Sequence, residues 1–150
     1  MTDFSLDLRV RWADLDPNGH VRHSAYYDYG TVARVAYLEE RGVGIRWMRE
    51  HGVGPVLFRE EAQFRRELNF GDIVTVNVLL TGLSKDHRKW SLRHEIRAGD
   101  EVCALLNLDG AWFDLKSRKV SAPPPELSSI FEQIAHAEDF AWIESGKSSP

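Results

Sequence analysis

The sequence predicts an α+β fold in which an antiparallel sheet of about five strands wraps around one long central helix, with a further helix near the C-terminus. Three observations predict it. One strand precedes a long helical segment with few charges, four segments with strand patterns follow, and an amphipathic helical pattern comes after a proline break. The 150 residues are 43% hydrophobic and 28% charged, which is typical of a single folded domain spanning 1–150.

The first strand is expected at residues 6–12. Leu6, Leu8 and Val10 alternate with charged residues, and this period of two is typical of a half-buried strand. The chain then reads DLDPNG at residues 14–19, where the proline lacks a donor and Asn-Gly favours a positive φ. A turn carrying two carboxylates is therefore predicted after the strand.

The long helix is expected over residues 24–41. Ser24 can cap its N-terminus, and Gly42 supplies a stop signal. Apolar residues recur at helical spacing, and few charges occur before Arg34. This pattern is typical of a helix buried on more than one side, so the rest of the chain must wrap it.

Four more strands are expected at residues 55–66, 73–83, 89–98 and 101–114. Short turns join them, so consecutive strands are expected to pair antiparallel. A sheet wrapped around one helix leaves an edge strand without a partner. Pairing with the same edge of a second copy is a common solution, so a homodimer with a continuous sheet, or a homotetramer, is expected.

The C-terminal helix is expected at about residues 126–137, after the three prolines at 123–125. Its apolar residues recur at helical spacing, at Leu127, Ile130, Phe131 and Ile134. Residues 145–150 offer little apolar surface to bury and are expected to fray.

Composition also narrows the function classes. The formal net charge of -4 gives no general attraction to nucleic acid or to anionic lipid. Cys103, the single cysteine, cannot form an intramolecular disulfide, and the chain shows neither a signal-peptide pattern nor an apolar run long enough to cross a membrane. The expected setting is the cytoplasm, and a ligand that carries phosphate would need a local basic patch.

The residues around the turn form a recognisable motif. Residues 11–21 read RWADLDPNGHV, a tyrosine-rich stretch follows at 26–29, and Ala33-Arg34 completes the pattern. This arrangement resembles the opening motif of hotdog-fold acyl-CoA thioesterases of the 4-hydroxybenzoyl-CoA thioesterase type. The order of the predicted elements agrees with the hotdog fold to about residue 120.

The resemblance implies hydrolysis of an acyl-CoA thioester to a free acid and CoA, without a metal or a separate cofactor. Asp16 would act as nucleophile or general base, and the backbone N–H of His23 would bind the developing oxyanion. One carboxylate suffices for an activated thioester carbonyl if that oxyanion is stabilised. His20 would contact the substrate or orient Asp16. Arg22 and His23 stand where many relatives have asparagine.

Several of these residues also have structural explanations. Asp14 and Asp16 suit an ordinary tight turn before a helix, and Asp14 is expected to be structural. His20 could equally be a histidine bonded to backbone. Some hotdog enzymes use an acidic residue within the long helix, and Asp28 and Glu39 are available there without matching that position. Glu60 interrupts an apolar strand face, where it is either a second polar group of the site or exposed by a bulge.

A basic turn at residues 85–89 reads KDHRK and matches the turn that binds the CoA phosphates in the 4-hydroxybenzoyl-CoA thioesterase type. Its cations, which suit phosphate by charge and donor geometry, are Lys85, Arg88 and Lys89. The alternative is that these charged residues only keep an exposed hairpin soluble and bind no ligand. A second candidate patch consists of Arg59, Arg65 and Arg66.

Two further functions remain open for the same scaffold. One is a thioesterase acting on acyl carrier protein, and the other is a non-catalytic protein that binds acyl-CoA. A dehydratase is disfavoured, because the expected His-Asp pattern is absent from the sequence.

Overall fold

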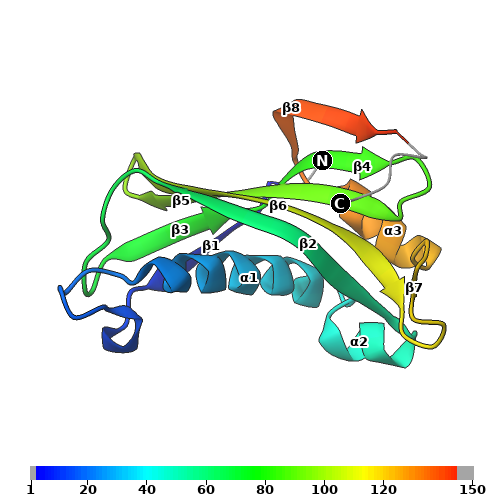
Figure 1. The fold of residues 1–150 in the computed structure, drawn as a ribbon, viewed down its shortest axis with the longest axis horizontal. Coiled ribbons are helices and arrows are strands. Elements are labelled where there is room, and N and C mark those ends of the chain that lie inside the picture. Colours follow the sequence, from blue (N-terminus) through cyan, green and yellow to red (C-terminus); the bar gives the residue numbers. More distant parts are fainter. Residues whose placement is uncertain (1–2, 145–150) are drawn as a thin grey trace.

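The computed structural model describes residues 3–144 and contains one curled sheet around helix α1 (Figure 1). The strands are β1 (Ser5–Arg9), β2 (Val53–Phe64), β3 (Ile73–Asn77), β4 (Leu79–Ser84), β5 (Lys89–Ala98), β6 (Glu101–Asp114), β7 (Lys119–Val120) and β8 (His136–Ile143). The helices are the 3-10 helix η1 (Trp12–Asp14), α1 (His23–Glu40), α2 (Ile45–Glu50) and α3 (Pro125–Glu132).

The sheet has β6 and β5 at its centre. Strand β2 pairs with one edge of β6, and β5 pairs with the other. The far edge of β5 pairs first with β4 and then with β3, which are separated only by Val78. Strand β1 continues the sheet beyond β3, and β8 lies parallel to β4. The predicted α+β class and the long helix inside a largely antiparallel sheet are confirmed.

Helix α1 packs closely against the concave face of the sheet. Ala25, Ala33 and Tyr37 on this helix are almost completely buried. At Gly30 an added Cβ would lie 2.6 Å from Leu106 and 3.0 Å from His94. The absence of a side chain at Gly30 therefore permits the close approach of helix and sheet.

The start of the chain differs from the prediction. Strand β1 ends at Arg9, and Trp12, expected on the buried face of a longer strand, begins helix η1 with 79% of its surface exposed. The carboxylate of Asp14 accepts the N–H of Arg11 and closes this turn. Helix α1 begins at His23 and no side chain caps it, so the expected cap by Ser24 is wrong.

The end of the chain differs as well. Helix α3 ends at Glu132, five residues earlier than expected, and residues 136–143 form strand β8, which pairs in parallel with β4. The short helix α2 between the long helix and β2 was not predicted. The expected fraying of 145–150 lies outside the described residues.

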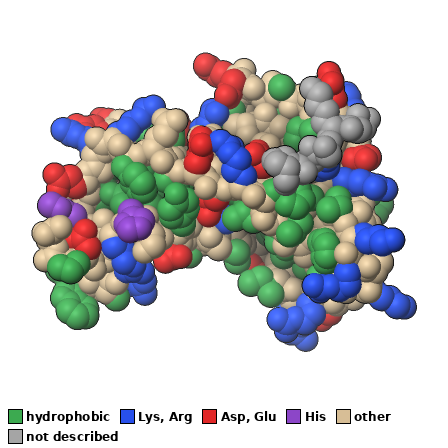
Figure 2. Space-filling view, in the orientation of Figure 1, with side chains coloured by type: hydrophobic (Ala, Val, Ile, Leu, Met, Phe, Trp, Pro, Cys, Tyr) green, Lys and Arg blue, Asp and Glu red, His purple; other side chains and the backbone are tan. Residues whose placement is uncertain are grey.

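Strand β2 is an edge strand of the sheet. No strand within residues 3–144 pairs with its outer edge. Three of its large apolar side chains, those of Leu57, Phe58 and Phe64, are 39–50% exposed. Apolar side chains reach the surface of the face shown in Figure 2, where β2 and α1 lie in Figure 1. Across the described part of the chain, no helix has the length and hydropathy that a membrane span requires.

Candidate active site

Asp16 lies in the loop between η1 and α1, in a rigid turn. Its Oδ1 accepts the N–H of Asn18 at 2.9 Å and that of His20 at 3.3 Å, and its own N–H donates to the carbonyl of His20 at 2.8 Å. An antiparallel bridge between Leu15 and Val21 closes the base of the loop. The half-buried Asp16 carboxylate is thus held in place by backbone donors to one of its two oxygens.

Asp14 is the structural anchor of the same loop, as predicted. It is only 1% exposed, and its carboxylate accepts hydrogen bonds from Tyr29 Oη at 2.9 Å and Arg11 Nη2 at 2.8 Å. Burial opposes ionisation, but these donors and the Arg11 charge hold the pKa of Asp14 below its usual value. Burial and the neighbouring carboxylate raise the pKa of Tyr29.

The N-terminus of α1 directly follows the Asp16 loop. His23 is the first helical residue, and Arg22 at the N-cap makes no side-chain capping bond. The first N–H groups of a helix lack carbonyl partners and carry a partial positive charge. The His23 amide, to which the family resemblance assigns the oxyanion hole, is therefore in an uncapped first turn, close in sequence to the loop that carries Asp16.

His20 is exposed and is held by the segment after β2. Its Nε2 lies 2.5 Å from Glu67 Oε2, and its backbone forms a bridge with Asn69. Asp16, His20 and His23 therefore share one end of the molecule. Within residues 3–144, no group of three His, Cys, Asp or Glu side chains is arranged to hold a metal.

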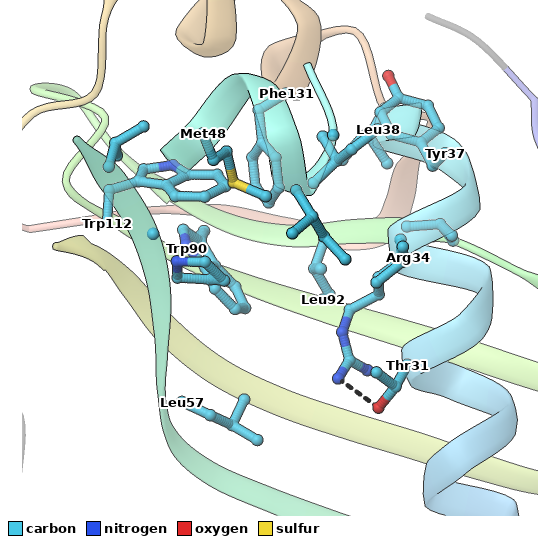
Figure 3. A pocket seen from close by; sticks show the side chains of 18 of the residues that line it. Thr31, Arg34, Tyr37, Leu38, Met48, Leu57, Trp90, Leu92, Trp112 and Phe131 are labelled. Atoms are coloured by element: carbon cyan, nitrogen blue, oxygen red, sulfur yellow. Dashed lines mark hydrogen bonds between the residues drawn. The ribbon is translucent and has the colours of Figure 1, made fainter. Parts of the chain in front are cut away.

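A cavity of about 430 Å³ lies between the C-terminal half of α1, helix α2 and the sheet. Its lining is largely apolar, and Figure 3 shows side chains from α1, α2, β2, β5, β6 and α3 converging on it. Trp90, Trp112 and Phe131 pack against one another, with ring centroids 5.2–6.0 Å apart.

The one charged group that reaches the cavity from α1 is Arg34, which belongs to a buried polar network. Arg34 Nη1 donates to His94 Nε2 at 3.1 Å, and His94 Nδ1 donates to the Asn77 carbonyl at 2.6 Å. Glu60 Oε2 lies 3.6 Å from Arg34 Nη1. Glu60 thus points toward α1, although β2 also has the irregularity, between Leu57 and Arg59, that a bulge would produce.

Burial controls the ionisation of this network. Complete burial, reinforced by the Arg34 charge, lowers the pKa of His94 to about 3, so the imidazole is neutral at physiological pH. Desolvation raises the pKa of Glu60, and Arg34 acts in the opposite direction. No sequence signal distinguished His94 from the other inward-facing residues of its strand.

The predicted site residues are not all brought together within one chain. Asp16 does not line the cavity, whose first lining residue on α1, Thr31, is eight residues beyond His23, or about 12 Å along the helix axis. The basic turn at 85–89 lies between β4 and β5, at the opposite end of the molecule from the Asp16 loop (Figure 1).

Sequence comparisons identify relatives of this chain. Residues 10–131 match the family model of the thioesterase-like superfamily. The long-chain acyl-CoA thioesterase FadM of Escherichia coli (strain K12) is 26% identical over 127 residues, covering 85% of this chain and 96% of that protein. A protein of Aquifex aeolicus (strain VF5) is 31% identical over 77 residues, covering 51% of this chain and only 60% of that relative.

Solved structures show the same fold. A 1,4-dihydroxy-2-naphthoyl-CoA thioesterase from Synechocystis superposes with a TM-score of 0.79 at 18% identity, covering 91% of this chain and 100% of the other. A Staphylococcus aureus protein in complex with CoA gives a TM-score of 0.82 at 15% identity, covering 99% and 96%. These neighbours confirm the predicted hotdog fold.

Proposed function

Because this chain belongs to the thioesterase-like superfamily, we propose that it is an acyl-CoA thioesterase that releases a free acid and CoA. The names of FadM and of the naphthoyl-CoA enzyme support a thioester substrate, and the S. aureus complex supports CoA as the carrier. The observation that carries the proposal is the rigid placement of Asp16 immediately before the uncapped N-terminus of α1.

Asp16 supplies the carboxylate of the reaction. As a general base it takes a proton from water, and the resulting hydroxide attacks the thioester carbon. As a nucleophile it attacks that carbon itself, forming an anhydride that water then hydrolyses. On both routes the C–S bond breaks, the acyl group leaves as a carboxylic acid, and the CoA thiolate accepts a proton.

The first turn of α1 supplies the electrostatic stabilisation. Attack converts the neutral carbonyl oxygen into an oxyanion, and the His23 N–H at the positive end of the helix would donate to it. Because the donor belongs to the backbone, the His23 side chain need not take part. The Asp14 anchor fixes this amide relative to the Asp16 loop.

A homodimer would complete the site. Antiparallel pairing of two β2 edges about a twofold axis would place the α1 N-terminus of one copy beside the C-terminal half of α1 of the other. The Asp16 loop of one protomer would then face the apolar cavity of its partner, which would receive the acyl group. The unpaired edge of β2 and its exposed apolar side chains support this arrangement.

The function is tested by measuring free-thiol release from short-chain, long-chain and aromatic acyl-CoAs. Turnover of one of these classes supports the proposal and identifies the substrate. Release from acyl carrier protein with none from acyl-CoA would instead support a carrier-protein thioesterase. Tight binding of acyl-CoA without any turnover would contradict an enzyme and support a binding protein.

A further inference from the structure

The apolar cavity reaches the surface beside helix α2 and the turn between β6 and β7. Ile45 on α2 and Leu115 in the turn both line the cavity, and they are 51% and 41% exposed. The N–H of Leu115 donates to the Gly52 carbonyl at 2.9 Å, which holds the turn against the segment that follows α2. The two aliphatic side chains therefore mark a mouth of the cavity at the end of the molecule where α2 and β7 lie (Figure 1).

Positive charge surrounds this mouth. Helix α2 and residues 114–119 contribute five exposed cations, which are Arg46, Arg49, Lys116, Arg118 and Lys119. Figure 2 shows Lys and Arg side chains at the end where α2 and β7 lie in Figure 1, with apolar side chains between them. These five cations and the two aliphatic side chains, Ile45 and Leu115, form a surface that we call the basic mouth.

The two carboxylates in these segments are already engaged. Glu50 Oε1 accepts a hydrogen bond from Arg46 Nε at 3.2 Å. Asp114 Oδ1 accepts the backbone N–H groups of Lys116 and Ser117 at 2.8 and 3.0 Å, and these bonds shape the turn. Two carboxylates against five cations leave the basic mouth positively charged.

This positive charge is local, because the chain as a whole has a formal net charge of -4. The side chains of Arg49 and Lys119 have no hydrogen-bond or ion-pair partner within residues 3–144. Cations around exposed aliphatic side chains are typical of surfaces that bind anionic bilayers, since the charges attract headgroups and the apolar side chains enter the acyl boundary. An acidic protein would match the charge, but it would not require an apolar cavity that opens between the cations.

We propose that the basic mouth binds the surface of an anionic lipid bilayer. The cations contact the lipid phosphates, and Ile45 and Leu115 enter the headgroup region. This binding goes beyond the proposed function, and only its consequence for turnover rests on that function. An acyl chain can then pass between the bilayer and the cavity without crossing water, where exposure of its apolar surface is unfavourable.

Co-sedimentation with lipid vesicles tests the binding without requiring turnover. The probes are vesicles of phosphatidylcholine alone and vesicles in which about a third of the lipid is phosphatidylglycerol. The unmodified protein should sediment with the anionic vesicles and not with the neutral ones. We expect each removed cation to weaken binding about fivefold, so Arg46→Ala/Lys116→Ala/Lys119→Ala should bind about a hundredfold more weakly.

A matched variant separates this surface from net charge. Arg9→Ala/Arg65→Ala/Arg66→Ala also removes three exposed arginines or lysines, but from β1 and from the segment after β2. It should bind the anionic vesicles as the unmodified protein does. Equal loss of binding in the two triple variants would overturn the inference, because net charge alone would then decide. Circular dichroism checks that each variant is folded.

Tryptophan quenching locates the face that meets the bilayer. Trp47 is half-buried on α2, whereas Trp12 is 79% exposed in η1, beside the Asp16 loop. Phosphatidylglycerol that carries bromine on its acyl chains quenches a tryptophan whose ring comes close to the acyl region. Quenching should be largely lost in Trp47→Phe and retained in Trp12→Phe. The reverse result would place the other end of the molecule on the bilayer and contradict the inference.

The outcomes separate this inference from the proposed function. Vesicle binding that depends on Arg46, Lys116 and Lys119, in a protein that releases no thiol, would support the basic mouth and contradict hydrolysis. Thiol release without any vesicle binding would support hydrolysis and contradict the basic mouth. Binding of acyl carrier protein in place of vesicles, lost in the same triple variant, would assign the cations to an acidic protein and overturn the inference.

Discussion

The hydroxyl of Tyr29 donates a 2.9 Å hydrogen bond to the buried carboxylate of Asp14. Tyr29 lies in the second turn of α1, and Asp14 closes η1 immediately before the loop that carries Asp16. This bond connects the candidate catalytic loop to the helix whose N-terminus is the candidate oxyanion hole. The position of the Asp16 loop relative to the N-terminus of α1 therefore depends on this hydrogen bond.

Tyr29→Phe is expected to destabilise the fold by about 1–3 kcal/mol, because the buried Asp14 carboxylate loses a hydrogen-bond donor. Urea unfolding measures the loss. Tyr27→Phe is the control, since the Tyr27 hydroxyl has no hydrogen-bond partner within the described residues. Equal stabilities for the two variants would show that the Tyr29 bond contributes nothing to the anchor.

The stability of the protein should fall in acid partly through Asp14. The pKa of Asp14 is lower in the folded state than in the unfolded chain, so its contribution is present above about pH 4 and is lost as the pH falls through the folded value. Denaturation midpoints between pH 7 and pH 3 should therefore fall less in Asp14→Asn than in the unmodified protein. Equal decreases of the midpoint in the two proteins would contradict this role of Asp14.

Arg34→Met should destabilise the protein by about 3 kcal/mol, because it leaves Glu60 without its cation and His94 Nε2 without its donor. Adding Glu60→Gln to this variant should restore part of the loss. A double-mutant cycle in urea measures the coupling. Strictly additive losses would mean that Arg34 and Glu60 do not stabilise each other.

The β2 edge should mediate dimer formation. Phe58→Lys/Phe64→Lys introduces charges at two exposed apolar positions of this strand that do not line the cavity, and should yield a monomer in analytical ultracentrifugation. Thiol release should be lost at the same time, although Asp16 is intact, because the cavity of the partner is no longer adjacent. A variant that stays dimeric and active would place the interface elsewhere.

The periodicity of apolar residues predicted the strands well where the residues it turns inward are also the ones that the sheet buries. The predicted ranges 89–98 and 101–114 coincide with β5 and β6, and the long helix is displaced by one residue. Buried residues alternate with more exposed ones along β5 and along the middle of β6, and both strands lie at the centre of the sheet, so the expected inward face is the buried one.

The prediction failed where a distant or side-chain contact decides the structure. Strand β1 ends early because the Asp14 carboxylate closes a turn around Arg11, a bond that periodicity does not encode. Strand β8 forms because β4 offers a free edge. The cavity was missed for the same reason, since it needs Met48, Trp112 and Phe131 from three elements far apart in sequence.

The most direct test of the central claim is the turnover of Asp16→Asn, measured on the acyl-CoA that the unmodified protein hydrolyses fastest. The substitution keeps the size of the side chain and removes its basicity. We predict that kcat falls about a thousandfold or more, while calorimetric affinity for free CoA stays within a factor of two to three. A kcat close to that of the unmodified protein would contradict the assignment of Asp16 as the catalytic carboxylate.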